Sequence, residues 1–257
     1  VPKSPRWLMM KGKENEAKKI NKKYAKEGQN WDAYIAYKTK GLEKAVQLAK
    51  KNRRKKPNLP KYYFELGRYS LLAKNYKLAE SALDRAYEMA LEQDEVWLRI
   101  DHYALLIALY TITGTKSTED FMEKALKLDA KNTWIILASL YSEMDEWEQT
   151  MNAAKEALEL SPERQDVLLA QAKAQAGLGF HKEALKNYEK ILQQQPQNGE
   201  VWLEKAQIYQ ALEEHVDAYK ALEKALDTSN LFTLSRVKAK NLYTKPHAQL
   251  RDKKTTL

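Results

Sequence analysis

The side chains best suited to catalysis or metal binding in this sequence are its four histidines, because the chain contains no cysteine. Thiolate metal sites, disulfides and cysteine nucleophiles are therefore excluded. His102 and His247 have no second histidine or carboxylate at metal-ligand spacing, and His181 and His215 occur 34 residues apart, which indicates equivalent packing positions. No glycine-rich phosphate loop or nucleophile elbow is present. We predict no catalytic residue, no metal site and no cofactor, and we expect that the protein is not an enzyme.

Lysine and arginine form two dense runs near the N-terminus. The first consists of Lys50, Lys51, Arg53, Arg54, Lys55 and Lys56. The second consists of Lys18, Lys19, Lys22 and Lys23. Clusters of this density attract the phosphates of nucleic acids or anionic lipid head groups, but charge runs also occur on solvated loops and helix ends. The first run is predicted to be a basic patch, and both interpretations of it stay open.

Charge is distributed unevenly along the 257 residues, whose net charge is +9. Residues 1–56 contain 18 basic and 5 acidic residues, and residues 229–257 contain 7 basic residues and 1 acidic residue. Residues 57–228 contain 19 basic and 29 acidic residues. An acidic middle thus lies between two basic ends.

The chain repeats itself at a spacing of 34 residues. The coinciding positions are Trp134, Leu168 and Trp202; Tyr141, Gln175 and Tyr209; Ala154, Tyr188 and Leu222; and Ala157, Ile191 and Ala225. Each unit contains two amphipathic stretches with helical periodicity, separated by a short break. Pro162 and Pro196 follow the second stretch, where proline ends one helix and can open the next. Each unit is therefore predicted to be a helix, a turn and a second helix.

These residues resemble the tetratricopeptide repeat, which has a large apolar residue at position 4, a small one at 8, an aromatic one at 11, alanine at 20 and 27, an aromatic or apolar residue at 24, and proline at 32. The unit starting at Lys131 supplies Trp134, Ala138, Tyr141, Ala154, Ala157 and Pro162, but it has Thr150 in place of the alanine at position 20. The resemblance implies an all-α, right-handed superhelical solenoid of helix-turn-helix repeats with helical caps.

Five units cover residues 60–230. Their predicted ranges are 60–93, 94–130, 131–164, 165–198 and 199–230. The second unit departs from the pattern, because its second-helix residues Phe121, Ala125 and Leu128 come about five residues late. We expect a lengthened first helix, a loop over 113–116, and Ser117 or Thr118 as the cap of the second helix.

Both ends of the repeat array are predicted to carry caps. Residues 1–29 are predicted to be a basic segment that is partly helical or disordered, with a helix over 13–26. Residues 30–59 form an N-terminal capping helix, predicted to be continuous over 30–52, and a basic loop. Residues 231–257 form a C-terminal capping helix to about residue 240 and a basic tail.

In the tetratricopeptide family, ligands usually lie along the concave face lined by the first helix of each repeat. Position 5 is apolar in all five units: Phe64, Leu98, Ile135, Leu169 and Leu203. Position 9 is polar in all five: Arg68, His102, Ser139, Lys173 and Gln207. Such paired rows suit a groove that binds a peptide or helix. The alternative is that a neighbouring helix or a terminal segment covers position 5.

The resemblance implies a scaffold, adaptor or assembly factor that binds a partner protein or peptide of unknown identity in this groove. The clamp for heat-shock chaperone tails is not supported, because the asparagines that it requires are replaced by residues such as Arg68 and Arg99. The alternative function is a module that binds nucleic acid or anionic membrane through its basic ends.

No stretch of the sequence is long and apolar enough to predict a transmembrane helix. We expect a cytoplasmic protein, with membrane-associated or exported placement as the alternatives. Because the chain begins at Val1 instead of methionine, we expect that processing or truncation removed its beginning.

Overall fold

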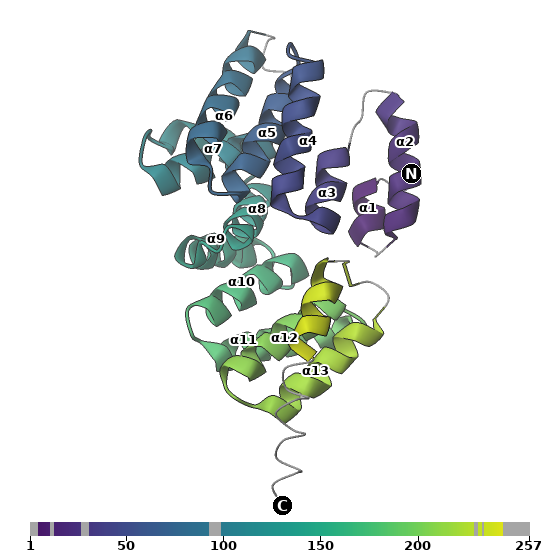
Figure 1. Ribbon diagram of the computed structural model, residues 1–257. Helices are drawn as coiled ribbons and strands as arrows, with labels where there is room; N and C mark the ends of the chain where they lie inside the picture. The colour runs from purple at the N-terminus through teal and green to yellow at the C-terminus, as the bar shows by residue number, and fades with distance from the viewer. Residues whose placement is uncertain are drawn as a thin grey trace, which may run out of the picture. The chain divides into compact units, whose positions relative to one another are not determined.

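The computed structural model describes residues 5–10, 13–26, 31–92, 99–228, 231–232 and 234–243. These residues form α-helices and their connections, with no β-strand among them (Figure 1). The predicted all-α repeat architecture is confirmed. The chain divides into two compact units, which we call the central unit (Leu42–Gly179) and the terminal unit (Val1–Gly41 with Phe180–Leu257).

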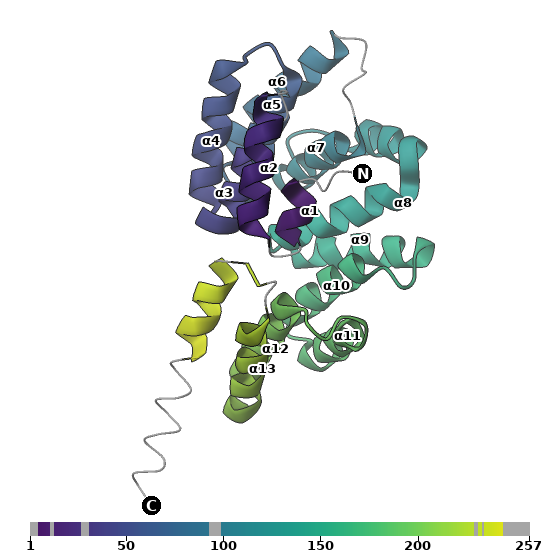
Figure 2. The same cartoon turned by 90° about the vertical axis from the view of Figure 1, so that its right-hand side faces the viewer.

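The central unit contains one leading helix and the helices of three and a half repeats. Its helices are α4 (Leu42–Lys55), α5 (Pro60–Leu72), α6 (Tyr76–Leu91), α7 (Ile100–Thr113), α8 (Glu119–Glu143), α9 (Trp147–Leu160) and α10 (Gln165–Gly177). Each helix packs on the next one along the chain, and α4, α5 and α6 lie side by side in both views (Figures 1 and 2).

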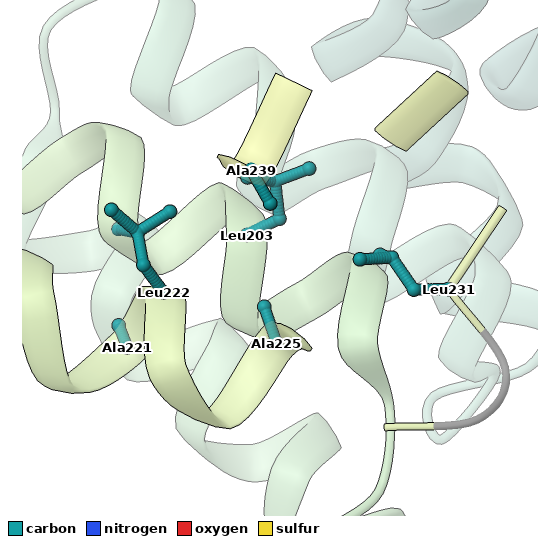
Figure 3. Packing of buried hydrophobic residues seen from close by; sticks show 7 residues of the cluster. Leu203, Ala221, Leu222, Ala225, Leu231 and Ala239 are labelled. Atoms are coloured by element: carbon teal, nitrogen blue, oxygen red, sulfur yellow. The ribbon is translucent and has the colours of Figure 1, made fainter. Parts of the chain in front are cut away.

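The terminal unit combines helices from both ends of the chain. They are α1 (Pro5–Met10), α2 (Glu14–Lys26), α3 (Asp32–Lys40), α11 (His181–Gln194), α12 (Gly199–Ala211) and α13 (His215–Asp227), followed by helical residues 234–243. Leu231 and Ala239 of the C-terminal segment pack with Leu203, Leu222 and Ala225 of α12 and α13 (Figure 3). Phe232 packs against a second cluster that α1, α2 and α3 supply.

The predicted continuous helix over 30–52 is wrong, because Gly41 interrupts it. Gly41 has φ +91° and separates α3 from α4. Glycine adopts this conformation readily, whereas other residues rarely do. The helix predicted over 13–26 is confirmed by α2, and the short helix α1 was not predicted.

The second repeat unit has the predicted loop, but its first helix differs from the prediction. Helix α7 is 14 residues long, only one more than α5, so the first helix is not lengthened but begins late, at Ile100. The predicted loop is present: Gly114 ends α7 with φ +64°, and the Ser117 hydroxyl accepts a hydrogen bond from the Glu119 amide at 3.3 Å. Asp129, with non-helical dihedral angles, kinks α8 and separates its two repeat halves.

Aromatic and charged side chains hold this irregular loop against α6. Phe121 packs against the rings of Tyr87 and Tyr110. The Tyr110 hydroxyl contacts Asp84, and the Lys116 ammonium donates to the Asp84 carboxylate at 2.6 Å. The pKa of Tyr110 is raised to about 12, mainly by burial and secondly by the hydrogen bond to Asp84. The neutral hydroxyl is therefore the form that this contact stabilises.

The first helix of each repeat ends in a left-handed residue. Lys74, Asp145, Gly179 and Glu213 occupy equivalent places and have φ of 57°, 61°, 86° and 60°. This conformation lets the amide after the helix reach back to the last turn's carbonyls. Only Gly179 adopts it without a steric penalty, so the other three positions carry local strain.

We predict that Lys74→Gly, Asp145→Gly and Glu213→Gly each raise the free energy of unfolding by about 0.5–1 kcal/mol, because glycine removes the clash between Cβ and backbone. Urea denaturation would measure this. Gly179→Ala is the matched control and should lower stability by about 1 kcal/mol. Destabilisation by all three glycine variants would contradict the assignment of strain.

Close approach of the two helices in a repeat depends on small residues. A Cβ atom on Gly67 of α5 would overlap Cγ and Cδ2 of Leu83 on α6. Leu83 is fully buried, so it has little room to move. Ala138, Ala172 and Ala206 hold the same repeat position in other units and are also fully buried.

Gly67→Ala should lower the free energy of unfolding by about 1–3 kcal/mol, because overpacking forces Leu83 out of its preferred position. The same substitution in a Leu83→Ala background should cost almost nothing. Thermal or urea unfolding of the four proteins would test this coupling, and equal costs in both backgrounds would show that Gly67 does not contact Leu83 as described.

Candidate functional site

The apolar row at position 5 is mostly buried. Phe64 on α5 is 3% exposed and Ile135 on α8 is 6% exposed. Leu169 on α10 is partly exposed, and Leu203 on α12 is 3% exposed. Leu98 lies outside the described residues. Leu169 is thus the one described member of this row whose side chain retains a substantial exposed surface.

Polar residues of position 9 are placed beside that row. Arg68 and Lys173 are partly exposed, and Ser139 on α8 is exposed. Together with Leu169, these side chains give the first helices of the central unit a mixed polar and apolar surface. This combination can form hydrogen bonds to a peptide backbone and cover apolar side chains.

The late start of α7 changes which residues of the second unit occupy repeat positions 5 and 9. Counting from Ile100 as the first helical residue, positions 5 and 9 fall on the buried residues Ala104 and Ala108. His102 is instead the third residue of α7. Its ring stacks on Phe64, with centroids 3.9 Å apart and an interplanar angle of 5°. His102 therefore lies beside the position 5 row, where its ring covers the side chain of Phe64.

An ion pair joins two first helices that belong to different repeats. The Arg68 guanidinium on α5 donates to the Glu143 carboxylate on α8 at 3.1 Å, although the residues are 75 positions apart. Their side chains are 31% and 28% exposed. The pair ties the first repeat directly to the third, and sequence reasoning, which considered each position separately, did not find it.

In the terminal unit, the C-terminal segment covers the equivalent positions. Ala239 and Leu231 pack with Leu203 in one cluster (Figure 3). The Lys238 ammonium donates to the Gln207 amide oxygen at 2.6 Å. The Gln210 amide donates to the Leu242 carbonyl at 3.5 Å. Positions 5, 9 and 12 of α12 thus all contact residues of this segment.

The basic patch lies on α4 and just after it. Lys50 to Lys55 form the last turns of this helix, and Lys56 follows its end. All are exposed except Arg53, which is partly buried with its guanidinium 5.6 Å from the Tyr63 ring centroid. In the second run, Lys18 pairs with Glu14 at 4.0 Å. The tail beyond residue 243 lies outside the described residues.

The histidines occupy the places that the repeat spacing predicts. His181 and His215 are the first residues of α11 and α13, and both are partly buried. His247 lies outside the described residues. Within the described ranges, no group of three or more histidine and carboxylate residues is placed to hold a metal ion.

Comparison with known proteins agrees with the observed architecture. The tetratricopeptide repeat family model matches residues 176–231. No curated protein sequence matches the chain significantly. Yeast Tom70 superimposes with a TM-score of 0.50 and 17% identity, over 80% of this chain and 44% of that one. The chain therefore spans less than half the length of Tom70.

Two further solved structures are similar over parts of their length. A Cut9–Hcn1 complex of the APC/C matches with a TM-score of 0.47 and 13% identity, over 94% of this chain and 48% of that one. MamA matches with a TM-score of 0.41 and 21% identity, over 65% of this chain and 90% of that one. The family match assigns tetratricopeptide repeats to residues 176–231, and the 34-residue spacing and the paired helices agree with this assignment.

Among the helices of the described residues, none has the length and apolar character needed to cross a membrane.

We predict that the Arg68 and Glu143 side chains contribute a coupling free energy of about 0.5–1 kcal/mol, because the pair is partly shielded from water. A double-mutant cycle with Arg68→Ala and Glu143→Ala, read out by urea unfolding, would measure it. Arg85 and Glu88, 3.2 Å apart but 49% and 60% exposed, are the control pair and should give a smaller coupling. Equal coupling in the two cycles would contradict the expected effect of burial.

Proposed function

We propose that this protein is a non-catalytic scaffold that binds a peptide segment or a helix of another protein. The binding surface in this proposal is the first-helix face of the central unit, around Ser139, Leu169 and Lys173. The family resemblance supports a role in protein binding, and the described residues add a reason to choose this surface.

The observation that carries the proposal is the contact between the C-terminal segment and α12. A stretch of chain with apolar residues and a lysine contacts positions 5, 9 and 12 of that helix. It packs against Leu203 and forms one hydrogen bond each with Gln207 and Gln210. On α8 and α10 the same repeat positions include Ser139, which is exposed, and Leu169 and Lys173, which are partly exposed. An external segment can therefore be held by the same kinds of contact.

The side chains of this surface restrict which ligand sequences can bind. Apolar side chains of the ligand would lie against Leu169, and its backbone or polar groups would bond to Ser139 and Lys173. An unpaired charge placed against Leu169 would cost about 2–5 kcal/mol. We therefore expect a segment that alternates apolar and polar residues, or a helix with one apolar side.

The first experiment is to capture partners with the whole chain as bait and to measure the affinity of the purified partner for the parent and variants. Ser139→Arg should weaken binding by about tenfold or more, because a bulky side chain would obstruct the proposed surface. Ser81→Arg is the matched control: Ser81 is also an exposed helical serine, but it lies on α6, a second helix. It should leave affinity unchanged.

Leu169→Glu provides a second probe, while Leu203 is unsuitable because it is buried in the terminal unit. The thermal midpoint of each variant should be measured beside its affinity, so that loss of folding is recognised. If Ser139→Arg and Leu169→Glu fold like the parent and bind the partner with parental affinity, this surface is not the binding site.

A further inference from the structure

The outward face of α4 carries a strip of lysine and arginine side chains. Ala45, Ala49 and Asn52 are buried on the opposite face. At about 3.6 residues per turn, the exposed residues Lys44, Lys50, Lys51 and Arg54 fall on the side facing away from them, and the exposed Lys55 lies at the edge of that side. Glu43 and Gln47 are the other exposed residues of that side before the last turn. The face is therefore strongly cationic and contains no exposed apolar side chain.

Within the part of the chain that the structure describes, the lysines and arginine of this strip are not neutralised by acidic partners. Lys50, Lys51, Arg54 and Lys55 form no hydrogen bond or ion pair with a described residue. The neighbouring residue Asn52 instead contacts the next helix. Its side-chain amide donates to the Glu65 carboxylate at 3.1 Å, which links α4 to α5. The helix is thus anchored through one face, and its charges project from the other.

Stabilisation of the helix end explains only part of this strip. Arg53, Arg54 and Lys55 lie in the last turn of α4, where positive charge interacts favourably with the helix dipole. That effect falls off within one turn. Lys50, Lys51 and Lys44 lie earlier in the helix, so the dipole gives no reason for their presence. Positive charge also continues past the helix end at Lys56, which is exposed.

We propose that the outward face of α4 binds the surface of an anionic phospholipid membrane through electrostatic attraction alone. A cluster of four to eight cations on a helix is typical of binding to phosphatidylserine-rich surfaces. The absence of exposed apolar residues on this face means that binding requires no insertion into the acyl chains. The helix instead lies against the head groups.

Nucleic acid is the less suitable polyanion for this face. Proteins that bind single strands combine cations with exposed aromatic rings on which bases stack, and the exposed outward residues of α4 include no aromatic side chain. Phosphate recognition in nucleic acids also favours the bidentate guanidinium of arginine. Four of the five exposed cations here are lysines, which act as point charges and suit a diffuse anionic surface.

The test uses the whole chain and sedimentation with two kinds of vesicle. One is pure phosphatidylcholine, and the other contains about 30 mol% phosphatidylserine. We expect binding to the anionic vesicles only, and we expect it to weaken at least tenfold between about 50 and 300 mM salt, since salt screens exposed charges. Binding to both vesicle types, or to neither, would overturn the proposal.

Two triple variants with equal charge loss then locate the surface. Lys50→Gln, Lys51→Gln and Lys55→Gln together should weaken vesicle binding by about tenfold or more. Lys182→Gln, Lys186→Gln and Lys190→Gln remove three exposed lysines of α11 and should change it less than about twofold. Glutamine is a good helix former, so both variants should keep the parental circular dichroism.

Three outcomes of this comparison would overturn the assignment to α4. The first is equal weakening by both triple variants, which would indicate a response to net charge alone. The second is parental vesicle binding by the α4 variant, which would place the membrane contact on another basic segment. The third is tighter binding of the parent to polyuridylic acid than to anionic vesicles at the same salt concentration, which would identify nucleic acid as the preferred polyanion.

Discussion

The structure depends on the fact that a single pair of helices cannot cover its own apolar face. Each repeat exposes large residues that only its neighbours can bury, so stacking is the source of stability. Stacking requires that the two helices of a pair approach closely, which explains why Gly67 lies against Leu83 and why alanine holds the same position in later repeats. Other features of the fold are adaptations to this packing or interruptions of it.

The interruptions have identifiable physical causes. Gly41 separates α3 from α4 with a backbone conformation that other residues rarely adopt. Asp129 bends α8 where two repeats meet, and its carboxylate accepts the Asn132 amide at 3.0 Å, which caps the following half of the helix. The irregular loop before α8 is held by the contacts among Asp84, Tyr110 and Lys116. The repeat stack therefore accommodates irregular connections by giving them local contacts of their own.

The proposed binding surfaces follow from how the same packing distributes side chains. First helices contribute a mixed surface in the central unit, whereas the C-terminal segment covers the corresponding positions of α12. Helix α4 packs through one face only, so its opposite face is available for a strip of cations. An apolar partner segment and an anionic membrane would thus contact different helices, and the two interactions need not compete for the same residues.

The sequence by itself determined the repeat architecture, because a spacing of 34 residues aligns Trp134, Leu168 and Trp202 and constrains which side of each helix is apolar. It also indicated the irregular second unit and the basic run. Only the tertiary structure placed the start of α7 at Ile100, paired Arg68 with Glu143, and laid the C-terminal segment on Leu203. The physical reason is that periodicity reports local helical geometry, whereas these contacts join residues far apart in the chain and depend on how the helices stack.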